Sequence, residues 1–154
     1  MAKIESIFEE FVDYIRENYP RAGKIIEVGV GQRVNVAERV KESLPLAEIL
    51  VTDQNEASMR SHATKKVRVV ADDLMFPQRA IYDGASLIYS INPPVEIVPP
   101  MVELAERVGA DLVILPRSDE QEYFTSEEWK RIVRAGRILG WRRFSAREAR
   151  RDRN

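Results

Sequence analysis

The residues best suited to chemistry in this chain follow four short apolar runs, each at the point where the run ends. They are Gly29 and Gly31 after residues 24–28, Asp53 after 48–52, Asp72 and Asp73 after 66–70, and Asn92, Pro93 and Pro94 after 85–91. Carboxylate and amide oxygens accept hydrogen bonds from hydroxyl and amino groups, and glycines let a ligand approach the backbone closely. The unpaired amides of the helix expected after Gly31 add hydrogen-bond donors. These residue types indicate a site that binds a polar ligand.

Strands and helices that alternate along the chain are expected to bring these residues together. Apolar periodicity predicts strands at 24–28, 48–52, 66–70, 85–91 and 111–115, and helices at 3–18, 35–43, 56–62 and 98–108. This order predicts an α/β fold, a Rossmann-like three-layer α/β/α sandwich with a mainly parallel sheet of five or six strands. Right-handed crossovers place the carboxyl ends of parallel strands at one edge, where such sheets bind ligands.

The segment from residue 125 onward is expected to add a basic helix and a tail. Thr125 to Glu128 has the pattern of a capping box that opens a helix. The apolar positions that follow have helical spacing, and they are Trp129, Ile132, Val133 and Leu139. We therefore predict a helix at 125–140, a short strand at 141–144 and a mobile tail at 146–154. Residues 1–154 are interpreted as one domain, with an N-terminal helix within 1–20 and a ligand-binding core at 24–116.

Composition excludes several classes of protein. The chain has 154 residues, 44% of them hydrophobic, and no stretch approaches the 18 uninterrupted apolar residues of a membrane span. The first residues are charged and lack the apolar region of a signal peptide, so we expect a cytoplasmic protein. There is no cysteine and His62 is the one histidine, which leaves no thiolate or histidine-based metal site. The 32% of charged residues and the lack of cysteine are typical of a thermophile.

Charge is distributed unevenly along the sequence. Residues 129–154 contain ten Lys or Arg and two acidic residues, a net of +8, so that the first 128 residues carry a net of −9. Such asymmetry suggests a polyanionic partner, and RNA is the one we expect. The side chains expected to contact it are Lys130, Arg131, Arg134, Arg137, Arg142 and Arg143. The competing interpretation is contact with the acidic part of the same chain or of a second copy in a homo-oligomer.

The pattern resembles class I S-adenosylmethionine-dependent methyltransferases, and the whole chain resembles a small uncharacterised archaeal family with a truncated version of that fold. The resemblance implies that Glu27, Gly29 and Gly31 of the E-x-G-x-G loop hold the methionine part of the cofactor. It implies that Asp53 binds the ribose hydroxyls and that Asp72 or Asp73 contacts the adenine amino group. Asn92, Pro93 and Pro94 match the motif with which amino-group methyltransferases hold the target nitrogen, and so are the catalytic candidates.

Two residues depart from the methyltransferase pattern. Arg33 replaces the usual third glycine, and Val95 stands where an aromatic residue would stack on a target base. The resemblance therefore implies cofactor binding more directly than catalysis. A cofactor- or nucleotide-binding module without activity remains an alternative, as does an NAD-dependent oxidoreductase. The oxidoreductase fits Gly29, Gly31 and Asp53, but Val34 replaces the third glycine of the dinucleotide fingerprint.

Overall fold

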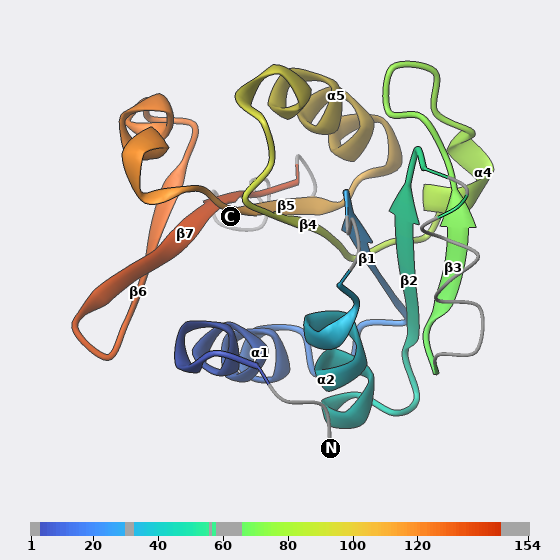
Figure 1. Ribbon diagram of the computed structural model, residues 1–154, viewed down its shortest axis with the longest axis horizontal. Coiled ribbons are helices and arrows are strands. Elements are labelled where there is room, and N and C mark those ends of the chain that lie inside the picture. The colour runs from blue at the N-terminus through green and yellow to red at the C-terminus, as the bar shows by residue number, and fades with distance from the viewer. Residues whose placement is uncertain (1–3, 30–32, 56, 58–65, 146–154) are drawn as a thin grey trace, which may run out of the picture.

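The computed structural model describes residues 4–29, 33–55, 57 and 66–145, and a seven-stranded sheet lies at its centre (Figure 1). In sheet order the strands are β3 (Arg68–Ala71), β2 (Glu48–Asp53), β1 (Lys24–Val28), β4 (Leu87–Ile91), β5 (Asp111–Leu115), β7 (Arg137–Arg143) and β6 (Lys130–Arg134). Strands β1 to β5 pair in parallel, whereas β7 is antiparallel to β5 and β6 is antiparallel to β7. The predicted α/β class with a mainly parallel sheet is confirmed, with seven strands in place of five or six.

Helices cover both faces of the sheet. α1 (Ser6–Asn18) and α2 (Asn35–Ser43) lie on one face, and α5 (Val98–Val108) lies on the other (Figure 1). Three short helices complete the described chain: α4 (Arg79–Tyr82), η1 (Val95–Ile97) and η2 (Ser118–Phe124). Among the described residues, no helix is both long enough and apolar enough to cross a membrane.

The central strand β1 supplies side chains to both layers of the core. Ile25 belongs to the hydrophobic cluster under α1 and α2, and Ile26 belongs to the cluster under α5. Successive side chains of a strand point to opposite faces, so Glu27 shares the α1 and α2 face with Ile25. A strand covered on both sides is mostly apolar, which is why residues 24–28 predicted it correctly in spite of Glu27.

Several predicted elements need their bounds moved or lie outside the described residues. The N-terminal helix begins at Ser6, β3 covers 68–71 in place of 66–70, and β4 begins at Leu87 in place of residue 85. The helix expected at 56–62, apart from residue 57, lies outside the described residues, as do Gly31 and the tail at 146–154.

The basic helix predicted at 125–140 is wrong, because this segment forms the hairpin of β6 and β7. Ala135 and Gly136 connect the two strands with φ angles of 51° and 74°. Positive φ at both central residues is the conformation of a type I′ turn. This turn joins the two strands of a hairpin because its twist matches theirs. Ile132 and Leu139, which fit a helical stripe in the sequence, instead enter the core under α1 from facing strands.

A buried carboxylate fastens this hairpin to the parallel part of the sheet. Asp111, at the start of β5, is 3% exposed and accepts hydrogen bonds from the Arg142 guanidinium at 2.9 Å and the Tyr19 hydroxyl at 2.7 Å. Its other oxygen accepts one from the Ser145 amide at 2.7 Å. Arg142 also donates to the Tyr14 hydroxyl. The buried charge is thus paired and hydrogen-bonded, and it joins α1, β5 and β7.

The aromatic side of the hairpin packs toward α5. The Phe124 ring contacts Trp129 edge-on at 5.0 Å between centroids and stacks on Trp141 at 6.3 Å. The Trp141 indole donates a hydrogen bond of 2.7 Å to the Gln121 side chain. Both tryptophans therefore contribute to packing.

Gly140 is the residue of β7 with the least room for a side chain. A Cβ atom placed there would lie 2.4 Å from the Ile114 carbonyl oxygen, closer than atoms of a folded protein approach. We expect Gly140→Ala to lower the free energy of unfolding by about 1–3 kcal/mol, the usual cost of overpacking. Urea denaturation measures it. Gly23→Ala is the matched control, since its Cβ meets nothing within 4 Å; equal stability of the two variants would contradict the prediction.

Candidate functional site

The residues singled out in the sequence meet at the carboxyl edge of the parallel strands. Gly29 follows β1, Asp53 ends β2, Asp72 and Asp73 follow β3, and Asn92 follows β4. Two cavities open at this edge, one on each face of the sheet, and both are lined by Gly29 and Asn92. The predicted convergence of these residues is therefore present in the structure.

Gly29 turns the chain out of the sheet. Its φ is +70°, a left-handed conformation that glycine adopts without strain. Its amide donates a hydrogen bond of 2.8 Å to the Thr52 carbonyl, which ties the turn to β2. A Cβ atom would meet only the Ser90 hydroxyl, at 3.8 Å. The backbone conformation, and not lack of space, therefore requires glycine here.

The acidic cavity, as we call the smaller one, lies beside β2 and β3 and has a volume of about 260 Å³. The polar side chains that line it are Thr52, Asp53, Gln54, Asp72, Asp73, Ser90 and Asn92. Three carboxylates around one cavity create a negative potential, which favours a ligand that donates hydrogen bonds or carries positive charge.

The three carboxylates of the acidic cavity differ in how much of their bonding capacity is already used. Asp72 is 8% exposed, and its two oxygens accept hydrogen bonds from the Tyr82 hydroxyl at 2.7 Å and the Gln78 amide at 3.1 Å. Burial raises the pKa of Tyr82, so its hydroxyl keeps its proton and remains a donor. Asp73 is exposed and caps the Met75 amide through one oxygen. Of the pair 72 and 73, Asp73 is therefore better placed to contact a ligand.

Asp53 occupies the last position of β2, between the two strands that border the acidic cavity. It is half-buried, and its Oδ1 accepts a hydrogen bond of 3.0 Å from the Asn55 amide. The bond fixes the carboxylate at the rim of the cavity, where a ligand hydroxyl can reach it.

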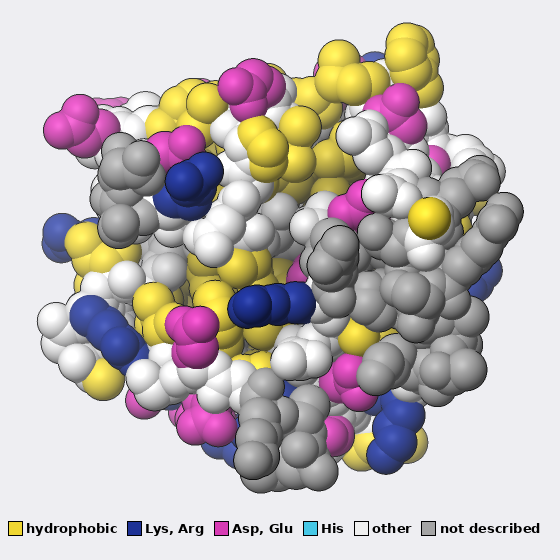
Figure 2. All heavy atoms as spheres, in the orientation of Figure 1, with side chains coloured by type: hydrophobic (Ala, Val, Ile, Leu, Met, Phe, Trp, Pro, Cys, Tyr) yellow, Lys and Arg dark blue, Asp and Glu magenta, His cyan; other side chains and the backbone are white. Residues whose placement is uncertain are grey.

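The α1 cavity, the larger one, has a volume of about 620 Å³ and lies between the carboxyl edge and the N-terminal part of α1. Its lining combines apolar and charged side chains: Ile4, Phe8, Val36 and Ile91 with Glu5, Glu27 and Arg33. Figure 2 shows hydrophobic side chains at the floor of a hollow on this face of the molecule, with charged side chains around it. Both cavities together have the size and mixed polarity of a small-molecule site.

Glu27 is the most unusual ionisable group of the site. It is 4% exposed, and its Oε1 atom has no hydrogen-bond partner among the described residues. Burial raises the pKa of this carboxyl from its ordinary value near 4.5 to about 7, while the nearby Tyr89 hydroxyl acts in the opposite direction. A buried acceptor without a partner is costly, and an orphaned carboxylate beside a cavity fits a cationic ligand.

Asn92 lines both cavities, whereas Pro93 and Pro94 line the acidic cavity. Asn92 has a φ of +51°, and its amide donates a hydrogen bond of 2.7 Å to the Leu115 carbonyl, which holds this strained backbone. The Asn92 side chain is exposed, Pro93 is buried, and Val95 begins η1. An exposed amide at the junction can accept a hydrogen bond from a group bound on either side.

Sequence reasoning did not identify the residues that support this site. Tyr82 holds Asp72, Tyr89 lies opposite Glu27 in the β1–β4 pair, and the Ser90 hydroxyl donates to the Val28 carbonyl at 2.8 Å. Polar residues inside the apolar run 85–91 were the available signal for two of them. Tyr82 lies in a segment without apolar periodicity, so no signal marked it.

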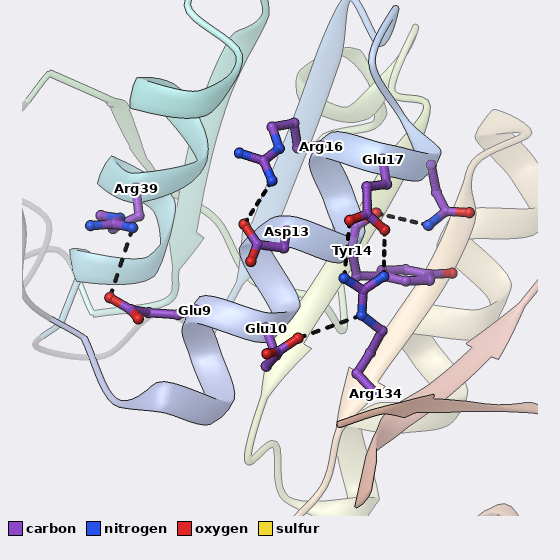
Figure 3. A network of polar contacts seen from close by, with 9 residues as sticks. Glu9, Glu10, Asp13, Tyr14, Arg16, Glu17, Arg39 and Arg134 are labelled. Carbon is purple, nitrogen blue, oxygen red and sulfur yellow. Dashed lines mark hydrogen bonds and ion pairs between the residues drawn. The ribbon is translucent and has the colours of Figure 1, made fainter. Parts of the chain in front are cut away.

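The six basic residues proposed to contact RNA lie on the hairpin, and three of them make ion pairs within the chain. Figure 3 shows Arg134 reaching Glu10 and Glu17 of α1. Arg143 pairs with Glu106 at 2.7 Å and with Glu128 at 2.8 Å. Arg142 pairs with Asp111 at 2.9 Å. Lys130 and Arg131 are exposed on β6, and Arg137 reaches the Ser6 hydroxyl at 3.3 Å. Part of the basic charge is therefore used inside the molecule.

The raised pKa of Glu27 predicts how stability depends on pH. Because the folded protein holds this proton more tightly than the unfolded chain, the contribution of Glu27 to stability is fully present below pH 4.5 and is lost as the pH rises toward 7. The loss amounts to about 3 kcal/mol, and Glu27→Gln should abolish it, since an amide does not titrate. Urea denaturation at pH 4 and pH 8 should show the variant gaining on the wild type at pH 8. Glu96→Gln, at an exposed carboxyl of η1, is the control; the same pH dependence in wild type and Glu27→Gln would contradict the prediction.

Solved structures similar to this one show which fold it has. A putative caffeoyl-CoA O-methyltransferase from Staphylococcus aureus is similar over 93% of this chain and 85% of its own, with a TM-score of 0.65 and 11% identity. A SAM-bound amino pentose methyltransferase from Micromonospora echinaspora gives a TM-score of 0.57 at 19% identity over 73% of this chain. This chain spans 52% of the length of that methyltransferase. The fold is therefore that of class I S-adenosylmethionine-dependent methyltransferases, a Rossmann-like α/β fold.

Sequence comparison gives the family. A UPF0146 protein of Archaeoglobus fulgidus is 41% identical over 107 residues, which are 70% of this chain and 76% of that protein. The model of the uncharacterised protein family UPF0146 matches residues 8–143, from α1 to the end of β7. The chain therefore belongs to the uncharacterised protein family UPF0146.

Proposed function

We propose that this protein binds S-adenosylmethionine at the carboxyl edge of its sheet and transfers the methyl group to an amino nitrogen. The observation that carries the proposal is the pair of cavities that meet at Gly29 and Asn92, one lined by three aspartates and the other by a buried glutamate. The nucleoside part fits the acidic cavity, with Asp53 toward the ribose hydroxyls and Asp73, or Asp72, toward the adenine amino group. The methionine part is assigned to Gly29 and the carboxyl of Glu27, which line the α1 cavity, and Gly31 of the same motif lies outside the described residues.

Charge favours this ligand over a dinucleotide. S-adenosylmethionine carries a sulfonium and an ammonium group, whereas the pyrophosphate of NAD is an anion. The carboxyl edge presents Glu27, Asp53 and Asp73, with Arg33 as the basic side chain among the described lining residues. An excess of carboxylates repels a pyrophosphate and attracts a cation. An oxidoreductase that uses NAD is therefore the weaker alternative.

Asn92, which lines both cavities, and Pro93, which lines the acidic cavity, offer what an amine acceptor needs. The side-chain oxygen of Asn92 and the carbonyl of Pro93 can accept hydrogen bonds from an amino group and direct its lone pair toward the methyl carbon. S-adenosylmethionine supplies a methyl group that is already activated by its positive sulfur. The new carbon–nitrogen bond forms as the carbon–sulfur bond breaks, and the nitrogen gives up a proton to water. A cofactor-binding module without activity uses the same cavities and would lack this last step.

The proposal predicts the effect of removing the Asp53 carboxylate. Asp53→Ala should weaken S-adenosylmethionine binding by about 1–3 kcal/mol, because charge-assisted hydrogen bonds to the ribose are lost. Isothermal titration calorimetry measures the affinity. Asp83→Ala, at an exposed carboxylate outside both cavities, is the control and should bind as the wild type does. No heat of binding with the wild type at millimolar cofactor would remove the proposal.

We also propose RNA as a candidate partner, and the exposed basic residues of β6 support this proposal. Lys130 and Arg131 are exposed and line a groove of about 320 Å³ beside α1, together with Phe144 and Tyr14. The two exposed cations suit a phosphate backbone, whereas Tyr14 is buried and the Phe144 ring is covered by the Arg142 guanidinium. The acidic side chains of α1 that pair with Arg134 border the same region and oppose RNA binding.

Salt dependence tests the RNA proposal. Replacing Lys130 and Arg131 together with alanine should weaken binding to structured RNA and reduce the slope of log K against log salt by about 2, since each side chain would neutralise one phosphate. Filter binding from 50 to 300 mM salt measures the slope. Alanine at Arg68 and Arg107, exposed basic residues on β3 and α5, is the matched control. RNA affinity that is equal in both double variants would place any RNA contact elsewhere.

A further inference from the structure

The α1 cavity is larger than the methionine part of the cofactor requires. Its volume is about 620 Å³, and sites of about 300–1,000 Å³ hold whole drug-sized molecules. The methionine part has the bulk of one amino acid, and the proposed function assigns it to Glu27 of β1 and to Gly29, which follows that strand. Most of the cavity therefore remains for a second molecule.

Three half-buried apolar side chains line the α1 cavity. Ile4 precedes α1, Phe8 lies in the first turn of α1, and Ile91 ends β4. Each packs against the core under α1 and α2 and also lines the cavity. The Glu5 carbonyl accepts hydrogen bonds of 3.0 Å from the Phe8 and Glu9 amides, which hold Phe8 in this turn. Exposed parts of apolar side chains that converge on one hollow are typical of a ligand-binding cavity.

The side chain proposed to bind the acceptor nitrogen lies next to this apolar surface. Asn92 follows Ile91 directly, is exposed, and lines the same cavity. Alternation along β4 places Ile91 on the same face as Tyr89, which is the face that α1 covers. An amino group held at Asn92 therefore leaves the rest of its molecule beside Ile91, in the cavity that Phe8 also lines.

We propose that the methyl acceptor is a small amine with an apolar body, which lies against Ile4, Phe8 and Ile91, and that these side chains determine its specificity. The inference rests on the proposed function and names its substrate class. The neutral nitrogen attacks the methyl carbon, and the carbon–nitrogen bond forms as the carbon–sulfur bond breaks. The products are the N-methylated amine, S-adenosylhomocysteine and a proton released to water. Binding is driven by the removal of the apolar body from water.

A base within RNA is the occupant that the surroundings of the cavity disfavour. Among the described lining residues, Arg33 is the one basic side chain, against the carboxyls of Glu5 and Glu27. This lining offers little to the phosphates that flank a base. The basic groove of the hairpin meets α1 at Tyr14 and Asn18. Asn18 lies ten residues beyond Phe8, which is about 15 Å along a helix. RNA held in that groove is therefore separated from the α1 cavity.

A series of 4-alkylanilines tests the inference, because its members share one planar amino group and differ in the length of the apolar body. The amino group of an aniline is uncharged at pH 7, so the carboxyls around the cavity do not select for it. Calorimetry with saturating S-adenosylhomocysteine in place of the cofactor gives the affinities of aniline, 4-ethylaniline and 4-butylaniline. Affinity should rise about fourfold for each methylene group. With S-adenosylmethionine, mass spectrometry should detect the N-methylated anilines.

Matched variants show whether the α1 cavity is the binding site. Phe8→Ala should lower the affinity for 4-butylaniline about tenfold, close to the value of a pair of buried methylene groups, and leave the binding of S-adenosylhomocysteine unchanged. Phe76→Ala is the control, since Phe76 is 84% exposed and lines neither cavity. Ile4→Ala, at a residue outside the helix, tests the same surface if Phe8→Ala does not fold, with a smaller expected loss.

Equal affinity for all three amines, or equal losses in Phe8→Ala and Phe76→Ala, would overturn the inference and leave cofactor binding standing. Methyl transfer to a single-stranded RNA in preference to the anilines would overturn it as well, and would make RNA the acceptor of the proposed function. A wild type that binds no S-adenosylhomocysteine would refute the proposed function and this inference with it.

Discussion

Parallel hydrogen bonding of β1 to both β2 and β4 is the constraint on which the rest of the structure depends. It sets Glu27 opposite Val51 on one side and opposite Tyr89 on the other, and it brings the ends of the first four strands to one edge. Each strand must leave the sheet at that edge, so the chain turns there through Gly29 and Asn92, both with positive φ. Where neighbouring strands end and their loops diverge, space is left at the edge of the sheet. The two cavities lie in this space.

The parallel core could be predicted from the sequence because its strands are buried on both faces. Such strands read as unbroken apolar runs, which no surface element imitates at that length. The hairpin could not be predicted from the sequence. Its apolar residues fit the period of a helix as well as they fit two strands, and they are Trp129, Ile132, Val133 and Leu139. The deciding feature was Ala135-Gly136, a two-residue turn with positive φ at both positions. Alanine seldom takes this conformation, so only Gly136 hinted at the turn.

The position of the candidate site could be predicted from the sequence, but the contacts that each of its residues makes could not. Parallel topology alone places Asp53, Asp72 and Asp73 at one edge. It does not show that the Asp72 carboxylate already accepts a hydrogen bond from Tyr82, ten residues further along the chain. The basic residues illustrate the same limit. Arg134 and Glu17 are 117 positions apart in the sequence, and their ion pair exists because α1 lies beside the hairpin strand that carries Arg134. Charge counts along a chain cannot show which charges meet in space.

Under the proposed function, the buried carboxyl of Glu27 would link ligand binding to the stability of the fold. An apolar residue in its place would suit the core of β1, since Ile25 fills the same layer. Burial instead disfavours the ionised form of the Glu27 carboxyl. The protein is therefore less stable at a pH where the ionised form predominates. A cationic ligand in the α1 cavity would reverse the effect of ionisation on stability, because it would stabilise the ionised carboxylate that burial disfavours. Ligand binding then recovers the free energy that folding lost, and the gain is largest for a ligand whose ammonium reaches Glu27. The same carboxyl thus lowers the stability of the fold at neutral pH, a cost that a bound cation would offset.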